Sequence, residues 1–318
     1  MSTLESITYP CQFDGTQQPA YRLTAVGAEP RPLLVALHTW SCTYTSFNKN
    51  YEKFCQQFNW HLIHPDFRGA NWEPLGCGSE AVVSDITDAV SYMQQNYAVD
   101  PKRIYLAGGS GGGHATLLLS GWRPEIWAAA SAWCPISDIQ AWHQQCLGTR
   151  FAHYAEHIVK ACGGNPQESA AARQQALARS PLTYLANAVS FPIDINTGIH
   201  DGHTGSVPVS QAINAYNCLA APADRISEDD CQYIVTKEQI PSQLQDSRLV
   251  SDPSYGSNIV HLRRQSRNVR LSIFEGGHDL LHWPLFSWLS RQERDSAPDW
   301  QTSGAYCQAD DKAVELSK

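Results

Sequence analysis

The sequence predicts an α/β protein with a mostly parallel central sheet and helices on both of its faces. Short apolar runs of strand length alternate along the chain with longer segments of helical periodicity. A glycine-rich turn joins one of these runs directly to a helical segment within residues 103–122. Strand–helix alternation implies parallel strands whose crossover helices cover the sheet. The 318 residues, of which 42% are hydrophobic, suffice for one large domain or two smaller ones.

The expected strands are short apolar runs bounded by turn residues. They lie at residues 33–37, 60–64, 104–107, 127–133, 193–199 and 269–274. The expected helices lie at residues 46–58, 81–97 and 114–119. The second helix carries an apolar face at helical spacing, formed by Val82, Ile86, Ala89, Val90, Met93 and Tyr97. Gly121 is expected to end the third, because glycine is a poor helix former.

Two stretches interrupt this alternation. Residues 137–180 are polar and helical between two expected strands, and residues 221–267 are rich in Pro, Ser and Asp with weak periodicity. Insertions of this length often form lids or pocket walls. We therefore expect a single domain over residues 1–318 with lid or cap insertions at 137–180 and 221–267. For the second stretch, a solvated surface segment without a function is the alternative.

Composition excludes several classes of partner. The chain has 31 acidic and 23 basic residues and a net charge of −8, which argues against nucleic acid and anionic membranes. No apolar run approaches the ~20 residues of a membrane span. The first residues lack the basic and apolar regions of a signal peptide, so the location stays open, with the cytoplasm favoured over secretion. The oligomeric state also stays open.

The glycine-rich turn has three readings, of which one fits. It reads Gly108-Gly109-Ser110-Gly111-Gly112. A dinucleotide fingerprint would need a third glycine where His114 stands, and a P-loop would need a lysine. The turn does match G-x-S-x-G, in which a sharp elbow between strand and helix exposes a nucleophilic serine. We therefore predict that Ser110 is a nucleophile.

The partners of Ser110 are expected on loops that follow later strands, because these loops gather at the carboxyl edge of a parallel sheet. Asp201 follows the strand at 193–199, and His278 follows the strand at 269–274. Histidine titrates near neutrality and can take the serine proton, and the carboxylate would fix the imidazole. Asp194 and Asp252 are the alternative acids, but the first lies in an expected strand and the second in an insertion.

The developing oxyanion needs backbone donors. The N–H of Gly111, the residue after the nucleophile, is the expected first donor. The second should come from the loop after the strand at 33–37, where Trp40 is our choice and Thr39 the second candidate.

The chain resembles the α/β-hydrolase superfamily, nearest to the catalytic domain of the prolyl oligopeptidase family and its esterase relatives. The resemblance covers roughly residues 30 to 295. It rests on the stretches LLVALHTWS, HPDFRGANWEPLGCG, VDPKRIYLAGGSGGGHATLLL, TGIHDGHTGSVP and FEGGHD. Two departures stand out: the acid usually lies closer to the Val-Pro pair, and His-Thr-Trp replaces the usual His-Gly-Gly oxyanion loop. The resemblance implies an α/β-hydrolase fold and serine hydrolase chemistry without a cofactor.

From these patterns we expect a serine hydrolase that cleaves carboxylic esters through an acyl-enzyme. Trp40 and Trp283 adjoin catalytic loops, and aromatic walls suit small or carbohydrate-linked esters such as acetyl or feruloyl groups. A prolyl-oligopeptidase-like serine peptidase is the alternative, and a binding module on an inactive scaffold is a third hypothesis. The candidate pocket residues are Trp40, His203, His282 and Trp283.

Three further features of the sequence are expected to be structural. His278-Asp279-Leu280-Leu281-His282 is close to the H-E-x-x-H zinc motif, but it starts at a Gly-Gly turn and holds Asp in place of Glu, so we expect no metal. The ten cysteines show no C-x-x-C pairs, which leaves disulfides and free thiols both open. Arg68 is expected to anchor its loop rather than to meet a substrate carboxylate.

Overall fold

The computed structural model of the chain describes residues 3–245, 251–301, 304 and 314–316. Its strands are β1 Glu5–Pro10, β2 Gln17–Leu23, β3 Arg31–Leu37, β4 His61–Pro65, β5 Val99–Gly109, β6 Ala129–Trp133, β7 Ile193–Gly198, β8 Val260–Ser266, β9 Val269–Phe274, β10 Asp279–Leu280 and β11 Val314–Glu315. Its α-helices are α1 Lys49–Phe58, α2 Glu80–Asn96, α3 Gly111–Trp122, α4 Ile139–Cys146, α5 Ala152–Cys162, α6 Ala170–Ala178, α7 Val209–Leu219, α8 Glu228–Lys237 and α9 His282–Leu289. Short 3₁₀ turns are Pro181–Thr183, Leu185–Asn187, Pro222–Asp224, Ser242–Leu244 and Pro253–Tyr255.

A central sheet organises the described part of the chain, with nine strands in the order β1-β2-β4-β3-β5-β6-β7-β9-β8. The strands from β4 to β9 in that order pair in parallel. Antiparallel strands close both edges, β1 and β2 on one side and β8 on the other. The predicted fold class, an α/β-hydrolase fold with a mostly parallel sheet, is confirmed.

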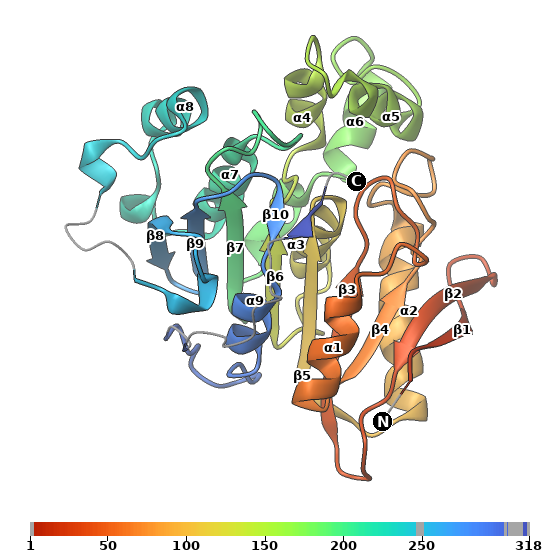
Figure 1. Cartoon of the computed structure of the whole chain (residues 1–318). Helices are drawn as coiled ribbons and strands as arrows, with labels where there is room; N and C mark the ends of the chain where they lie inside the picture. The colour runs from red at the N-terminus through yellow and green to blue at the C-terminus, as the bar shows by residue number, and fades with distance from the viewer. Residues whose placement is uncertain (1–2, 246–250, 302–303, 305–313, 317–318) are drawn as a thin grey trace.

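The strands are apolar because both faces of the sheet are covered. In β3, Leu33, Val35 and Leu37 pack in the cluster that contains α2, α3 and α7, whereas Leu34 and Ala36 pack in the cluster that contains α1 and α9. Figure 1 shows the same division, with α1 and α9 in front of the sheet and the other three helices behind it. Successive side chains of a strand point to opposite faces, so both must be apolar.

Most expected elements differ from the structure by a few residues at one or both ends, and two of these boundaries have a clear local cause. The helix expected at 46–58 begins at Lys49, because the Asn48 side chain accepts a hydrogen bond from the N–H of Asn50 and caps it. Gly121 does not end its helix, since α3 continues to Trp122. A Cβ on Gly121 would lie 2.4 Å from the carbonyl carbon of Tyr184, so this glycine permits a close backbone approach.

The two stretches between core elements fold differently. Residues 137–180 form α4, α5 and α6, which lie above the carboxyl ends of the parallel strands (Figure 1). Residues 221–267 include α8 and also β8, which is an edge strand of the central sheet. The expectation that the whole of 221–267 lies outside the core is therefore wrong for residues 260–266. Their strand was missed because an edge strand alternates polar and apolar residues over a short length.

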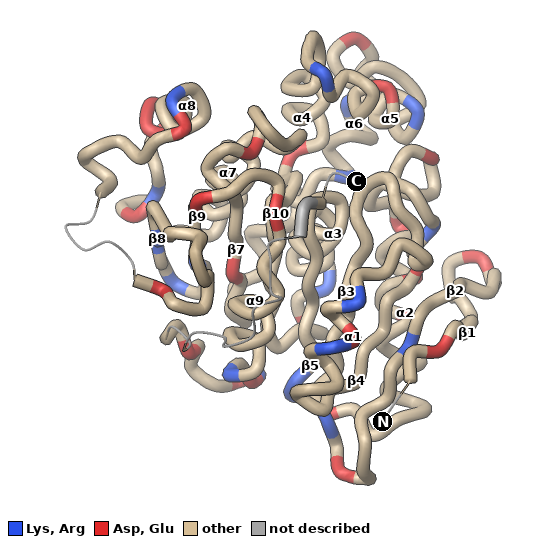
Figure 2. The backbone as a smooth tube through the Cα atoms, viewed as in Figure 1, with Lys and Arg blue, Asp and Glu red and all other residues tan. Residues whose placement is uncertain are grey.

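Charged residues of both signs are interspersed along the backbone, as Figure 2 shows. Among the described residues, no helix is long and apolar enough to cross a membrane. The cysteines that the structure describes carry free thiols, and most are buried.

Candidate active site

Ser110 lies in the sharp turn between β5 and α3. Its backbone has φ 57° and ψ −119°, a conformation that costs free energy in a residue other than glycine. A Cβ on Gly112 would lie 2.3 Å from the carbonyl oxygen of Leu37, so the helix can approach β3 this closely only with glycine there. The turn therefore has the geometry of a nucleophile elbow, with Ser110 at the carboxyl end of the strand.

His278 follows β9 and hydrogen-bonds to Asp201, which follows β7. The distance from His278 Nδ1 to Asp201 Oδ2 is 2.7 Å, and both side chains are buried. The carboxylate oxygen accepts the Nδ1 proton, which leaves Nε2 for another partner. Nε2 is buried and has no hydrogen-bond partner within the described residues, Ser110 included. Catalytic hydrogen bonds are often long before substrate binds, so this geometry is compatible with a general base.

The acid loop holds Asp201 with backbone donors. The N–H groups of Gly202 and Val207 donate to Asp201 Oδ1 at 3.0 and 3.2 Å. The loop between these two residues folds over His278, because a Cβ on Gly205 would lie 2.3 Å from both Asp201 Oδ1 and His278 Cβ. This fold accommodates the longer spacing between the acid and the Val-Pro pair.

The two alternative acids bind arginines. Asp194 lies within β7 and pairs with Arg270 at 2.7 Å. Asp252 caps the 3₁₀ turn at Pro253–Tyr255 and pairs with Arg263 at 2.7 Å. Of the three carboxylates, Asp201 is the one that hydrogen-bonds His278.

The expected oxyanion donors lie next to each other. A Cβ on Gly111 would lie 2.4 Å from the backbone nitrogen of Trp40. Gly111 is the first residue of α3, and an N–H in the first turn has no carbonyl partner within its helix. The Trp40 N–H donates no hydrogen bond to another described residue. Both groups can therefore serve an incoming oxyanion.

Of the four candidate pocket residues, His282 lines a hollow that also includes Gly109, next to Ser110, whereas Trp40, His203 and Trp283 are not among its lining residues. The Trp40 ring is buried and packs edge-on against Trp142 of α4, with ring centroids 4.8 Å apart. His203 bonds the carbonyl of Val235 at the end of α8. His282 and Trp283 pack against the aromatic residues of α1, on the α9 side of the sheet. The Trp40 ring thus packs against α4 and does not line an open pocket.

The zinc-like spacing of His278 and His282 does not produce a shared site. His278 lies before β10 and bonds Asp201, whereas His282 begins α9 and its Nδ1 lies 3.5 Å from the Asn50 amide. Burial lowers the pKa of His282 to about 3. The two histidines face different partners because β10 separates them.

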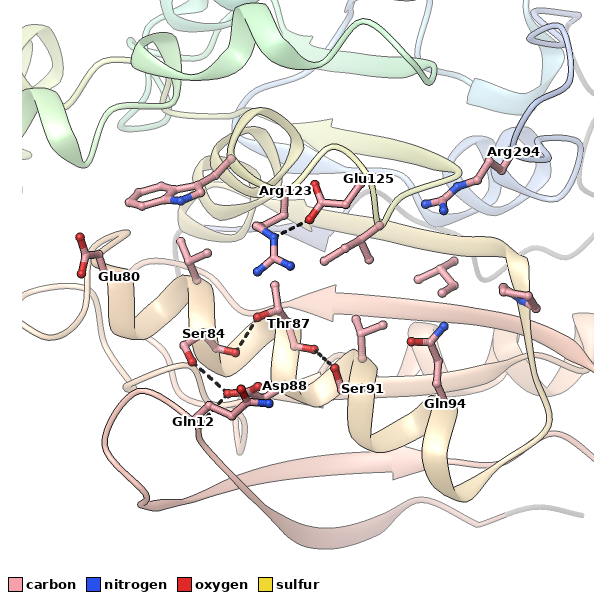
Figure 3. A pocket seen from close by; sticks show the side chains of 16 residues that line it. Gln12, Glu80, Ser84, Thr87, Asp88, Ser91, Gln94, Arg123, Glu125 and Arg294 are labelled. Carbon is pink, nitrogen blue, oxygen red and sulfur yellow. Dashed lines mark hydrogen bonds and ion pairs between the residues drawn. The ribbon is translucent and has the colours of Figure 1, made fainter.

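Two hollows lie in different places. One has a volume of about 230 Å³, and its lining includes Gly109, which precedes Ser110, together with Thr39, Tyr51, Leu280 and Leu316. The other is an open groove of about 600 Å³ along α2, shown in Figure 3. Its polar groups bind one another, as Ser84 binds Asp88 and Arg123 binds Glu125. This groove borders Pro101 and Ile104, toward the amino end of β5, so it is remote from Ser110.

Arg68 anchors its loop, as expected. Its guanidinium pairs with Asp85 at 2.8 Å and with Asp14 at 2.6 Å. Although burial opposes the charged form, these carboxylates together raise the pKa of Arg68. The contacts connect the loop after β4 to α2 and to the β1–β2 turn.

The sequence reading missed two residues that contact the catalytic loops. Trp142 of α4 packs on Trp40 and donates from Nε1 to the carbonyl of Ser206 in the acid loop at 2.8 Å. Cys134 follows β6, and its sulfur lies near both Asp201 and His278. The strand-end rule that found Asp201 and His278 also points to Cys134, whereas nothing local marks Trp142.

Known proteins are similar to this chain in family and in fold. The prolyl oligopeptidase family matches residues 66–230. A search of curated proteins finds no match. Among solved structures, the fold is similar to an acylaminoacyl peptidase of Pyrococcus horikoshii, with 15% identity, a TM-score of 0.64, and coverage of 94% of this chain and 43% of that one.

Two other structures are similar over a smaller part. Oligopeptidase B from Leishmania major gives 16% identity and a TM-score of 0.52, covering 67% of this chain and 30% of that one. Prolyl oligopeptidase B from Galerina marginata gives 15% identity and a TM-score of 0.54, covering 67% and 31%. The chain spans less than half the length of these proteins. The match over half of its residues shows that this chain belongs to the prolyl oligopeptidase family of serine hydrolases.

Proposed function

We propose that the chain is a serine peptidase that cleaves short or acylated peptides through an acyl-enzyme on Ser110. The observation that carries the proposal is the buried His278–Asp201 hydrogen bond, which leaves Nε2 of His278 without a partner. Family membership and the peptidases of similar fold favour this reading over the ester hydrolase expected from sequence. The ester hypothesis relied on Trp40 and Trp283 as aromatic walls of the pocket, and the Trp40 ring is buried.

In the proposed reaction, His278 Nε2 takes the Ser110 proton while Oγ bonds to the scissile carbonyl carbon. Asp201 holds the imidazole and stabilises its cation. The N–H groups of Gly111 and Trp40 stabilise the oxyanion. When the C–N bond breaks, His278 returns the proton to the leaving amine. Water then attacks the acyl carbon and gives a proton to His278. The bond between that carbon and Ser110 Oγ breaks, His278 passes the proton to Oγ, and the carboxylic acid product leaves.

The hollow of about 230 Å³ is our proposed subsite for the acyl group. Its lining joins Gly109, directly before the nucleophile, with Thr39 of the oxyanion loop. Phe47, Tyr51, Leu280 and Leu316 supply apolar lining. The other lining residues include Ser46, Asn48 and three histidines, His38, His64 and His282, whose pKa values are lowered by burial. A lining without a charged group suits an uncharged side chain or acyl tail.

Fluorophosphonate labelling with peptide mapping tests the nucleophile. We expect labelling at Ser110, its loss in Ser110→Ala, and its retention in Ser120→Ala, a matched buried serine of α3. Turnover in Ser110→Ala should fall on the order of 10⁴-fold or more, as in other serine triads. Persistent labelling in Ser110→Ala would remove Ser110 from the mechanism.

A matched substrate panel tests the bond that is cleaved. The same acyl groups are offered as peptidyl or acylaminoacyl anilides and as nitrophenyl, acetyl-sugar and feruloyl esters. We expect kcat/KM to rise with the length of the peptide on the acyl side. Turnover of the sugar-linked esters with no turnover of any peptide or anilide would overturn the peptidase proposal and restore the esterase.

A further inference from the structure

Cys134 binds the loops that carry the acid and the histidine. It follows β6, it is fully buried, and its backbone has φ 44°, in the region that favours glycine. Its N–H donates to the carbonyl of Asn196 in β7 at 2.7 Å. Its sulfur lies 3.4 Å from the carbonyl oxygen of Asp279 and 3.8 Å from that of Gly277. The thiol thus reaches the carbonyls on both sides of His278.

The sulfur also lies beside the hydrogen-bonded pair itself. Cys134 Sγ, a carboxylate oxygen of Asp201 and a ring nitrogen of His278 are all within 4.8 Å of one another. Burial, followed by the charge of Asp201, raises the pKa of the Cys134 thiol well above its ordinary value. The thiol therefore keeps its proton and can donate it, and it is a poor nucleophile or metal ligand in this state.

We propose that Cys134 is a positioning residue for the His278–Asp201 pair. Its S–H donates to the backbone that flanks His278, and its sulfur fills the space beside Asp201. This inference rests on the proposed function, because it assigns a role to Cys134 in the same site.

The physical reason lies in the acceptors around the thiol. Removing the sulfur would leave the carbonyls of Gly277 and Asp279 and the carboxylate of Asp201 around one small void. A void lined by several acceptors can admit water. Such a water would donate to Asp201 and compete with the Nδ1 proton of His278, which would loosen the orientation of the imidazole.

The test compares Cys134→Ala with Cys134→Ser. Both variants keep a Cβ, so the backbone strain at φ 44° is the same as in the native chain. Cys55→Ala, which removes a buried thiol of α1, is the matched control for a loss of packing alone. The two readouts are the downfield proton resonance of His278 Nδ1–H in NMR spectra and the separate values of kcat and KM for the best substrate.

We expect Cys134→Ala to shift the Nδ1–H resonance upfield or to lose it by exchange. It should lower kcat by about tenfold, the size expected for one lost hydrogen bond, with little change in KM. Cys134→Ser should restore the resonance and most of kcat, because a hydroxyl also donates. Cys55→Ala should keep both.

An unchanged resonance and kcat in Cys134→Ala would overturn the inference. Equal losses in Cys134→Ala and Cys55→Ala would also overturn it, because they would reflect packing alone. Failure of the proposed function is distinct: the native chain would then resist fluorophosphonate at Ser110. In that case the Nδ1–H resonance alone would still decide whether Cys134 positions the pair.

Discussion

Asp194, near the amino end of β7, and Asp201, beyond its carboxyl end, are both buried carboxylates, yet their partners give them different tasks. Asp201 bonds His278, and Asp194 bonds Arg270. Asp194 lies within β7, opposite Arg270 of the neighbouring strand β9. Asp201 lies on the loop beyond β7 and can turn toward the loop that carries His278. Position relative to the strand end thus separates the candidate acid from a structural ion pair.

Exchange of each acid for its amide should separate these tasks. Asp201→Asn should lower kcat/KM by up to ~10⁴-fold with the fold intact, because an amide favours the wrong imidazole tautomer. Asp194→Asn should keep kcat/KM but lower the free energy of unfolding by about 3–5 kcal/mol, because it leaves the Arg270 cation buried without a charged partner. Enzyme kinetics and urea unfolding of both variants check this. Near-native activity in Asp201→Asn, with collapse in Asp194→Asn, would show that the acid is misassigned.

Gly205 is a second prediction at the scale of one residue. A Cβ there would lie 2.3 Å from Asp201 Oδ1 and from His278 Cβ, well inside contact distance. Gly205→Ala should therefore push the two side chains apart and reduce kcat/KM by at least about tenfold. Gly304→Ala is the control, because a Cβ there would meet nothing within 4 Å. Equal kinetics in the two variants would contradict the tight packing of this loop.

At the scale of elements, α8 is held to the sheet by histidine–glutamate contacts. His200 Nδ1 bonds Glu238 at the end of α8 at 2.7 Å, and its Nε2 bonds Glu275 at the end of β9 at 2.9 Å. His261 of β8 also bonds Glu275 at 2.7 Å, and His203 lies 3.8 Å from Glu238. Although partial burial opposes the charged form, the hydrogen bonds to both glutamates raise the pKa of His200 above 6.5. The link is therefore strongest when His200 is protonated.

The raised pKa of His200 sets the sign of a pH effect. Its contribution to stability should be fully present below about pH 6.5, the ordinary histidine pKa, and should fade as the pH rises through the higher folded value. Hydrogen bonds from His261 and His200 lower the pKa of Glu275 below 4.5. Glu275 therefore stays charged, and keeps its contribution to stability, until the pH falls through that lower value. We expect His200→Gln to lower the melting temperature more at pH 6 than at pH 8.5. His153→Gln, an exposed histidine of α5, should show no such difference.

At the scale of the whole molecule, buried histidines should make the protein labile in acid. Burial lowers the pKa of His64 to about 3, of His114 to about 4 and of His282 to about 3. The unfolded chain binds protons at these residues below about pH 6.5, whereas the folded chain does not. Stability should therefore fall as the pH drops below that value, by at most about 1.4 kcal/mol per pH unit for each histidine.

Urea unfolding between pH 4.5 and 7 measures this slope. His114→Gln should reduce it by the share of one histidine, because Gln can still donate to the Arg179 carbonyl that His114 Nε2 contacts. His200 is protonated in both states over most of this range, so its opposite effect does not mask the slope. A slope that is the same in His114→Gln and in the native chain would contradict the assignment.

Most of the strands and the three candidate catalytic residues could be predicted from the sequence alone. Strands buried on both faces read as apolar runs, and β9 was expected at residues 269–274, where it lies. The elbow is a local feature, because strand, glycines and helix adjoin Ser110 in the chain. The candidate acid and histidine were found from the rule that loops at the carboxyl ends of parallel strands gather at one edge of the sheet.

The tertiary structure decided what depends on packing between distant segments. The His278–Asp201 bond joins residues 77 apart and needs Gly205 in the loop between Asp201 and Val207. The burial of Trp40 depends on α4, and the place of β8 depends on pairing with β9. The sulfur of Cys134 meets carbonyls more than 140 residues away along the chain. Periodicity and turn residues encode local structure, whereas such contacts arise only when the loops pack together.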